Sequence, residues 1–323
     1  MTHAVADHEG LICAFQLAPR VQREADVLAD VEAAGPLWLH FNLGDIRAQR
    51  WIEQWAPIPD EARSILCQVD ARVQVEVFPD GFLIVLGDLH HDFGADPEAV
   101  DNLRIYVDAH RMITSRHHPL RTSDRLRLEL RRGHEIDKPI ALFEHFVELL
   151  ADTFRGVVVQ LTDEVDDAEE RVVGGRYLDQ GTTIARMRRL LVRLRRFIGA
   201  DRTALGHLAG RLPAAFGAEE RRRLREAIEA LDAVAQDLEL VHDRARLLQE
   251  EIAGRVGEAT SRNLYILSIV TTLLLPVTLI TGVFGMNVPG LPWLGHPNGF
   301  WWVVAIMAIT LVTTIYFLRR RML

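Results

Sequence analysis

The C-terminal part of the chain contains two long apolar segments, residues 263–284 and 300–318, and neither includes a charged side chain. A helix rises about 1.5 Å per residue and the hydrocarbon layer of a bilayer is about 30 Å thick, so about 20 apolar residues can cross it. The residues before 263 mix polar and apolar types. The pattern therefore predicts a soluble region followed by two membrane-spanning helices.

The first 138 residues follow the patterns of short strands and helices. A helix is expected at 46–55, and apolar segments of strand length lie at 11–15, 37–41, 73–78, 82–86, 103–107 and 112–115. Pro79-Asp80-Gly81 predicts a hairpin turn in which Gly81 can adopt a positive φ. A second hairpin is expected across residues 108–111. These patterns predict an α/β domain over residues 1–138.

Residues 139–216 are predicted to form two long antiparallel helices. Pro139 can occupy the first turn of a helix, where its missing N–H has no partner anyway. Apolar residues recur every three or four positions from there to Gly174-Gly175, which end the helix. A second helix of the same kind is expected over about 183–209.

From Ala218 the same spacing continues through a stalk region, residues 217–262, and no proline interrupts it before Pro276. One helix is therefore predicted to continue from the stalk into the first span, residues 263–287. So long an apolar stripe is not stable alone, and it must pack against the preceding helices or against copies of itself. The stalk thus argues for a homo-oligomer.

Composition narrows the class of protein. The chain has 323 residues, of which 49% are hydrophobic, and a formal net charge of −8. An acidic soluble region suits a protein that collects cations and argues against a nucleic-acid partner. Cys13 and Cys67 are too few for a disulfide framework or a zinc knuckle. Because the sequence contains no Walker loop, nucleophile elbow or His-Glu-x-x-His motif, no enzymatic activity is predicted.

The arginines predict the topology. Arg262 precedes the first span, and the tail, residues 319–323, opens with three arginines, whereas the loop between the spans, 288–299, carries no charge. By the positive-inside rule both termini are expected in the cytoplasm. The first residues show no signal-peptide pattern. We expect a multi-pass protein of a bacterial-type inner (plasma) membrane, in contact with membrane lipids.

The first span ends in Gly285-Met286-Asn287. This tripeptide at this place resembles the signature of the CorA superfamily of divalent-cation transporters, and residues 278–288 followed by 296–300 look most like its ZntB branch, described as zinc transporters. The resemblance implies an α+β membrane protein with an N-terminal cytoplasmic α/β/α domain, a long helical stalk and two C-terminal transmembrane helices (300–318 being the second). It also implies a homopentameric funnel in which Gly285, Met286 and Asn287 form the selectivity filter.

The first span is the better candidate for a pore lining because it carries more hydroxyl groups. Helical spacing back from Asn287 places on one face Ser261, Leu264, Ser268, Thr271, Leu275 and Thr278. Hydroxyl oxygens can contact a hydrated ion, and leucines can form constrictions that dewet. The alternative is that the hydroxyls only bond to carbonyls of their own helix. Further back, the same phase places Asp243 and Glu250 toward the lumen of the funnel.

The loop bears on the choice of ion. Asn287 offers a neutral carbonyl oxygen that can hold an ion through its water shell. Magnesium-transporting relatives commonly carry Met-Pro-Glu after the signature, whereas this loop has no carboxylate, which favours Zn²⁺ over Mg²⁺ and leaves Co²⁺ and Ni²⁺ open. His296 is a second candidate metal ligand, since imidazole suits Zn²⁺; a solvated loop histidine is the alternative.

No permanently bound cofactor is expected, and the transported cation is the ligand. A different class of function also remains open, a membrane-anchored sensor or scaffold that conducts nothing. Such a protein would tolerate loss of the Asn287 side chain, whereas a transporter would lose selectivity or flux.

Three further clusters carry candidate chemistry. His90-His91-Asp92 and His117-His118 lie at strand ends and together could form a cytoplasmic zinc site. An acidic segment, residues 163–170, is expected to pair with the arginines of 186–196 on the antiparallel neighbouring helix. Membrane phosphates or nucleic acid are the alternative partners of these arginines.

Overall fold

The computed structural model describes residues 10–17, 35–54, 58–91, 100–177, 180–286, 288, 291–293 and 296–322. The chain divides into two compact units, Met1–Gln249 and Glu250–Leu323. The first unit contains a β-sheet and a group of long helices, and the second contains the two apolar segments.

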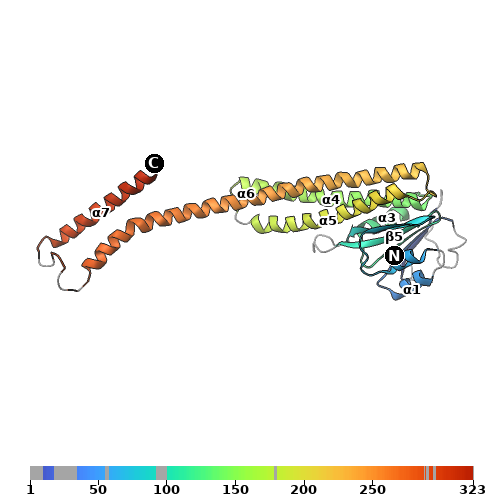
Figure 1. Ribbon diagram of the computed structural model, residues 1–323, viewed down its shortest axis with the longest axis horizontal. Helices are drawn as coiled ribbons and strands as arrows, with labels where there is room; N and C mark the ends of the chain where they lie inside the picture. Colours follow the sequence, from blue (N-terminus) through green and yellow to red (C-terminus); the bar gives the residue numbers. More distant parts are fainter. Residues whose placement is uncertain are drawn as a thin grey trace. The chain divides into compact units, whose positions relative to one another are not determined.

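Six strands of the first unit form one mixed sheet (Figure 1). Their order across the sheet is β1-β2-β6-β5-β4-β3. Both predicted hairpins are present, because β3 pairs with β4 and β5 pairs with β6, each antiparallel. Only β2 and β6 run parallel among the described pairs. The strands are β1 (Leu11–Gln16), β2 (Leu37–Asn42), β3 (Gln74–Val77), β4 (Gly81–Leu89), β5 (Val100–Asp108) and β6 (Arg111–Arg116).

The reason for a glycine at position 81 differs from the one expected. Among the described glycines, positive φ occurs at Gly10, Gly133 and Gly175, so the predicted positive φ of Gly81 was wrong. Gly81 instead begins β4 directly beside β5, where an added Cβ would lie 2.5 Å from the carbonyl oxygen of Val107. The close approach of two strands requires the glycine, not the turn.

Helices cover both faces of the sheet, which gives the expected α/β/α layers. On one face, α1 (Ile46–Gln54) and α2 (Asp60–Cys67) bury Ile52 and Leu66 against Leu83 of β4. Side chains alternate between the two faces along a strand, so Phe82, the neighbour of Leu83 in β4, points to the other face. There its ring packs edge-on against Phe143 of α4, with ring centroids 5.1 Å apart. Burial of each such side chain contributes about 1.5–3 kcal/mol.

The second face is covered by α3 (Arg121–Arg131), α4 (Pro139–Val173) and α5 (Gln180–Arg211). The proline at the start of α4 lies in the first turn, as predicted. The helix ends at Gly174, and Gly175 adopts φ 81° while the Arg176 N–H bonds to the carbonyl oxygen of Arg171. Neither α2 nor α3 was predicted from the pattern of apolar residues.

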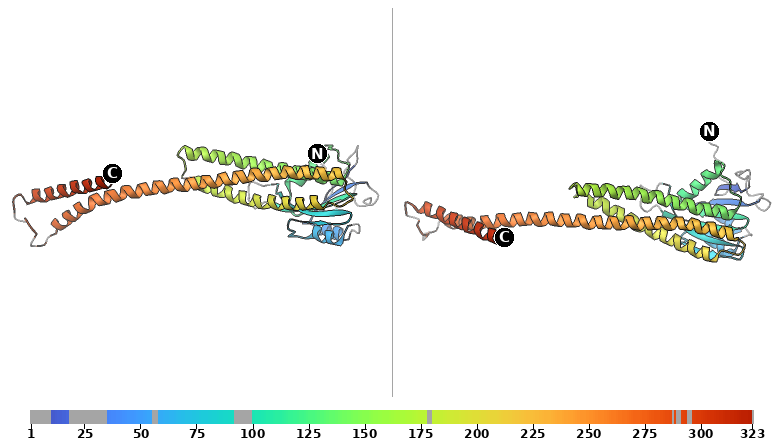
Figure 2. Two further views of the ribbon diagram at one scale, coloured as in Figure 1. Left: turned by 45° about the horizontal axis from the view of Figure 1, so that its top comes forward. Right: turned by 90° about the horizontal axis from the view of Figure 1, so that it is seen from above.

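The long helix α6 (Ala218–Phe284) is continuous, as its uninterrupted apolar spacing predicts. Within the first unit it lies alongside α4 and α5 (Figure 2). Its buried apolar residues within this unit are Leu224, Ala227, Ile228, Leu231, Val234, Leu238, Val241, Ala245 and Leu248, and all of them except Ile228 belong to the predicted stripe. The stripe therefore packs against the preceding helices of the same chain in this unit.

The second unit contains the C-terminal part of α6 and the helix α7 (Gly299–Met322), and both are long and apolar enough to cross a bilayer. Their apolar side chains are exposed around the helices: Leu264 is 59% and Leu275 66% exposed. A helix that exposes apolar groups in all directions is suited to lipid or to partner helices. Pro276 lies inside α6 and cannot donate to the carbonyl of Thr272, and the red-orange end of α6 curves in Figure 1.

Candidate functional site

The signature tripeptide begins at the end of α6. The N–H of Gly285 donates to the carbonyl oxygen of Thr281 at 2.9 Å, and the N–H of Met286 donates to the carbonyl oxygen of Val283 at 3.4 Å. A Cβ on Gly285 would lie 2.9 Å from the same Thr281 oxygen, so this turn needs a glycine. Asn287, the expected ion ligand, lies outside the described residues.

Aromatic and backbone contacts order the described part of the loop after the tripeptide. The rings of Phe284 and Trp293 stack with centroids 6.4 Å apart. Trp293 adopts φ 65°, and its carbonyl oxygen accepts a hydrogen bond from the N–H of His296 at 3.1 Å. A Cβ on Gly299 would lie 2.5 Å from that carbonyl oxygen, so α7 must begin with a glycine.

His296 binds the start of α7 through its backbone and its ring. Its carbonyl accepts from the Gly299 N–H at 3.0 Å, and its Nδ1 accepts from the Asn298 N–H at 3.3 Å. A ring that accepts at Nδ1 carries its proton on Nε2 when neutral. This arrangement favours the alternative of a loop histidine over a metal ligand.

The six residues expected to line a pore are all exposed in the single chain, and at 100° per residue they fall within an arc of about 100° on α6. Thr271 and Thr278 donate their hydroxyls to the carbonyl oxygens of Leu267 and Leu274, at 2.8 and 2.9 Å. These are the bonds of the alternative interpretation. They use the hydroxyl protons and leave the oxygen of each hydroxyl able to accept a further contact, so these bonds do not prevent contact with an ion.

Asp243 and Glu250 lie two helical turns apart on α6, and both are exposed. The buried residues Val241, Ala245 and Leu248 occupy a different face of the same helix. The side of α6 that carries Asp243 and Glu250 is thus not the side buried against the neighbouring helices, although it also exposes Leu240 and Leu247.

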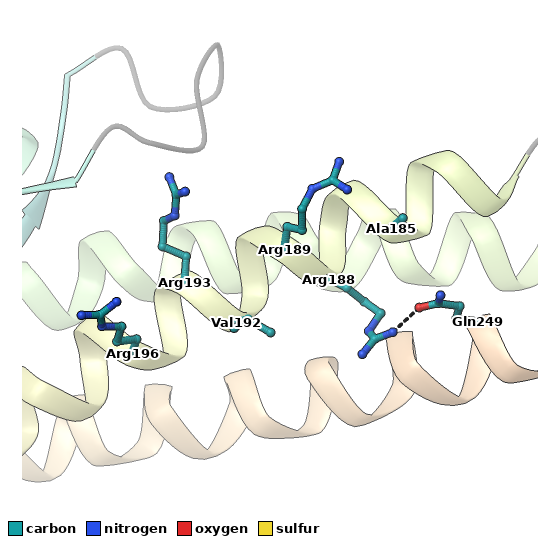
Figure 3. A pocket seen from close by; sticks show the side chains of 7 residues that line it. All are labelled: Ala185, Arg188, Arg189, Val192, Arg193, Arg196 and Gln249. Carbon is teal, nitrogen blue, oxygen red and sulfur yellow. Dashed lines mark hydrogen bonds between the residues drawn. The ribbon is translucent and has the colours of Figure 1, made fainter.

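The arginines of α5 line a pocket together with α6. Figure 3 shows Arg188 reaching across to Gln249 of α6, with which it forms a hydrogen bond, while Arg189 and Arg193 point away from α6. The pocket is lined by Ala185, Arg188, Arg189, Val192, Arg193, Arg196 and Gln249.

The expected pairing of the acidic segment with the arginines of α5 was wrong for the ion pairs that the structure describes. Asp166 and Glu169 of α4 both bind Arg244 of α6, with Glu169 at 2.8 Å. On the other side, Arg195 of α5 binds Glu239 of α6 at 2.6 Å. Because α6 lies alongside both helices, it offers an arginine to one neighbour and a carboxylate to the other.

The histidines at the strand ends come together with a residue that the sequence did not single out. Within the described part of the chain, His90, Asp101 and His118 form a group whose ligand atoms all lie within 4.8 Å of one another. Asp92 lies outside the described residues. Asp101 was missed because it is near neither histidine in the sequence; only the pairing of β5 with β4 brings it there.

Two buried carboxyl groups were also missed. Asp88 of β4 accepts hydrogen bonds from the Thr122 N–H at 3.0 Å and hydroxyl at 2.7 Å, and burial raises its pKa to about 6. Asp201 of α5 is fully buried against the same strand. No sequence pattern marks either residue as buried, since an isolated aspartate is usually exposed.

The family of the chain follows from comparison with known proteins. A family model described as CorA-like Mg2+ transporter protein matches residues 33–320. The chain is 28% identical over 302 residues to the divalent cation transporter CmaX of Pseudomonas aeruginosa, with 91% of each protein covered. It is 26% identical over 317 residues to the zinc transport protein ZntB of Pectobacterium carotovorum subsp. carotovorum, covering 97% of this chain and 96% of the relative.

Solved structures agree with this relationship. Full-length CmaX superposes with a TM-score of 0.81 at 27% identity, covering 98% of this chain and 99% of that one. The complete CorA magnesium transporter from Methanocaldococcus jannaschii shares the fold, with a TM-score of 0.78 at 19% identity over 95% of this chain and 97% of that one. The predicted fold class and resemblance are confirmed, and the chain belongs to the CorA-like Mg2+ transporter protein family.

Proposed function

We propose that the chain forms a homopentameric transporter that conducts divalent cations across an inner membrane, with Zn²⁺ as the favoured cargo. The observation that carries the proposal is the exposed face of α6 that alternates hydroxyls with leucines and leads to Gly285-Met286-Asn287. Membership of a family of Mg²⁺ transporters and similarity to proteins named as divalent cation and zinc transporters support it.

The need for several copies follows from the membrane part. One pair of helices cannot enclose a water-filled path, so an ion pathway requires α6 from several subunits around an axis. The exposed apolar surface of α6 and α7 is available for lipid and for such contacts. The number five is what the family resemblance implies.

The proposed mechanism combines electrostatic attraction of cations by carboxylates with selection of the ion by uncharged oxygen ligands. Asp243 and Glu250 raise the local concentration of cations by their negative charge. The leucines of the pore face provide constrictions, and the hydroxyls contact the ion's water shell. At the outer end of the path, Asn287 binds the hydrated ion through a ring of amide oxygens, with Gly285 and Met286 shaping the turn.

The preference for Zn²⁺ rests on the loop at 288–299, which has no carboxylate to attract a strongly hydrated Mg²⁺. Mg²⁺, Co²⁺ and Ni²⁺ are the alternative cargoes. The uncharged loop faces outward in this proposal, and Arg262 and Arg319 lie on the cytoplasmic side with both termini.

Uptake into proteoliposomes tests the proposal. The purified chain is reconstituted, and entry of Zn²⁺, Mg²⁺ and Ni²⁺ is compared with and without a pH gradient. We expect Zn²⁺ entry that exceeds Mg²⁺ entry and that falls, or loses its selectivity, in Asn287→Ala. Faster Mg²⁺ entry would reassign the cargo. Absence of any flux, with Asn287→Ala indistinguishable from wild type, would instead support a non-conducting sensor or scaffold.

A further inference from the structure

We propose that His90, Asp101 and His118 form a binding site for one divalent transition-metal ion in the first unit, apart from the residues of the ion pathway. Their ligand atoms lie within 4.8 Å of one another. A tetrahedral zinc site with bonds of about 2.0–2.1 Å has its ligand atoms about 3.3 Å apart, so small side-chain rotations complete the geometry.

Each ligand is carried by a backbone that the fold already holds. His90 follows β4 and forms a bridge with Leu120, and its carbonyl oxygen accepts a hydrogen bond from Arg121 at 3.1 Å. Asp101 lies in β5, opposite Asp88 of β4. The carbonyl oxygen of His118 accepts from Arg116 at 3.3 Å. A site built on ordered segments loses little conformational entropy when it binds.

The side chains are also directed toward one another. The rings of His90 and His118 have centroids 4.9 Å apart. Asp101 uses Oδ1 to accept from the Asn102 N–H at 2.7 Å, and its Oδ2 lies 2.9 Å from Nδ1 of His118. Because a carboxylate only accepts, this Nδ1 carries a proton. When an ion binds at Nδ1 of the neutral ring, this proton is lost from Nδ1 and Nε2 takes up a proton from solvent, so the ring binds the ion as a neutral imidazole.

The donor set determines the class of ion. Two imidazole nitrogens and one carboxylate oxygen suit Zn²⁺, Co²⁺ and Ni²⁺, whereas Mg²⁺ prefers six oxygen ligands in octahedral geometry. The site is accessible, since the side chain of His118 is 63% exposed. It thus selects against Mg²⁺ by ligand chemistry, independently of what the pore conducts.

The position of the site gives binding a structural effect. The three ligands come from the end of β4, from β5 and from the connection between β6 and α3. An ion that binds all three ligands cross-links these three segments of the chain. Binding to the folded state alone raises the stability of the unit in proportion to the logarithm of the free ion concentration.

Metal titration of the purified full-length protein in detergent, without an affinity tag and stripped with chelator, tests the proposal. The probes are Zn²⁺ by equilibrium dialysis and Co²⁺ by its visible absorption. The test variant is His90→Ala/His118→Ala. The matched control is His110→Ala/His207→Ala, which removes two exposed histidines outside the group.

We expect wild type and control to bind one more Zn²⁺ per chain than the test variant, and to show a Co²⁺ band that the test variant lacks. Asp101→Asn is expected to weaken Zn²⁺ binding by about tenfold or more. Equal Zn²⁺ stoichiometry in wild type and test variant would overturn the proposal, as would displacement of Zn²⁺ by an equal concentration of Mg²⁺.

A thermal measurement distinguishes loss of the metal site from unfolding of the double variant. His118→Ala changes an exposed side chain, so its apparent Tm without metal is expected to match wild type. Added Zn²⁺ should raise the Tm of wild type and of the control but not that of His118→Ala. The same Zn²⁺-induced rise in all three proteins would also overturn the proposal.

Discussion

Asp201 of α5 accepts a hydrogen bond from the backbone N–H of Gly87 in β4, with 2.8 Å between nitrogen and Oδ1. Its Oδ2 is buried and has no hydrogen-bond partner among the described residues. Burial raises the pKa of Asp201 well above its ordinary value; the charge of Asp88 raises it further, and the hydrogen bond from Gly87 only partly opposes this. A carboxyl group that resists ionisation therefore joins α5 to the sheet.

This pKa predicts that stability falls as the pH rises. The folded state binds the Asp201 proton more tightly than the unfolded chain, whose aspartates titrate near about 3.9. The stabilising effect is complete below that pH and is lost as the pH rises through the folded-state pKa. Asp201→Asn keeps an acceptor for Gly87 and removes the titration, so the Tm of the variant relative to wild type should increase from pH 5 to pH 8.

Thermal unfolding of both proteins, followed by circular dichroism across that range, checks the prediction. A constant difference in Tm between variant and wild type would show that Asp201 does not titrate differently in the folded state. Asp237→Asn, at an exposed position of α6, is the control for loss of one carboxylate.

Gly285→Ala should disturb the turn that begins the signature. A Cβ would lie 2.9 Å from the Thr281 carbonyl oxygen that accepts the hydrogen bond of residue 285. Strain of this kind costs about 1–3 kcal/mol, enough to shift the tripeptide that follows. We expect a loss of cation uptake in proteoliposomes, whereas Gly282→Ala, whose new Cβ would meet nothing within 4 Å apart from the neighbouring backbone of its own helix, should retain uptake.

The hydroxyl groups of the pore face are tested by valine, which preserves side-chain shape. Thr271→Val/Thr278→Val removes two oxygens from the proposed ion path, and uptake should fall several-fold. The control is Thr313→Val/Thr314→Val in α7, whose hydroxyls donate to carbonyls four residues earlier at 2.8 Å in the same way. If both double variants lose equal flux, the hydroxyls act only within their own helices.

Charge reversal on the stalk tests electrostatic attraction. Asp243→Lys/Glu250→Lys places positive charge on the face proposed to line the funnel, and cation flux should fall by about tenfold at low salt and by less at high salt. Asp237→Lys/Glu251→Lys makes the same change of net charge on other faces of α6. Unchanged flux in the first variant would remove these two residues from the pathway.

The sequence predicts the elements whose signals are local. The hairpins, the glycine stop after α4 and the unbroken α6 all follow from spacing and turn residues within a few positions. The short helix α2 also had a local signal, since Pro59 precedes Asp60 and Glu61 in its first turn, but it lies outside the regular apolar pattern.

Features that depend on distant segments were not predictable from spacing. Asp101 joins the two histidines through strand pairing, and Arg244 rather than an arginine of α5 binds Glu169 because of how three helices pack. A helical pattern fixes which residues share a face but not which neighbour that face meets. The chemistry of these clusters is therefore a property of the tertiary structure.

The parallel pairing of β2 with β6 constrains the order in which a growing chain can fold. Trp38 of β2 donates a hydrogen bond to the hydroxyl of Thr114 in β6, 76 residues later in the chain. Because synthesis adds about 5–20 residues per second, this partner of β2 is made about 4–15 s after β2 itself. The two apolar segments emerge from the ribosome after every strand of the sheet and after α5. The first unit thus has all its described strands before the two apolar segments leave the ribosome, so its sheet can form before those segments can reach a membrane.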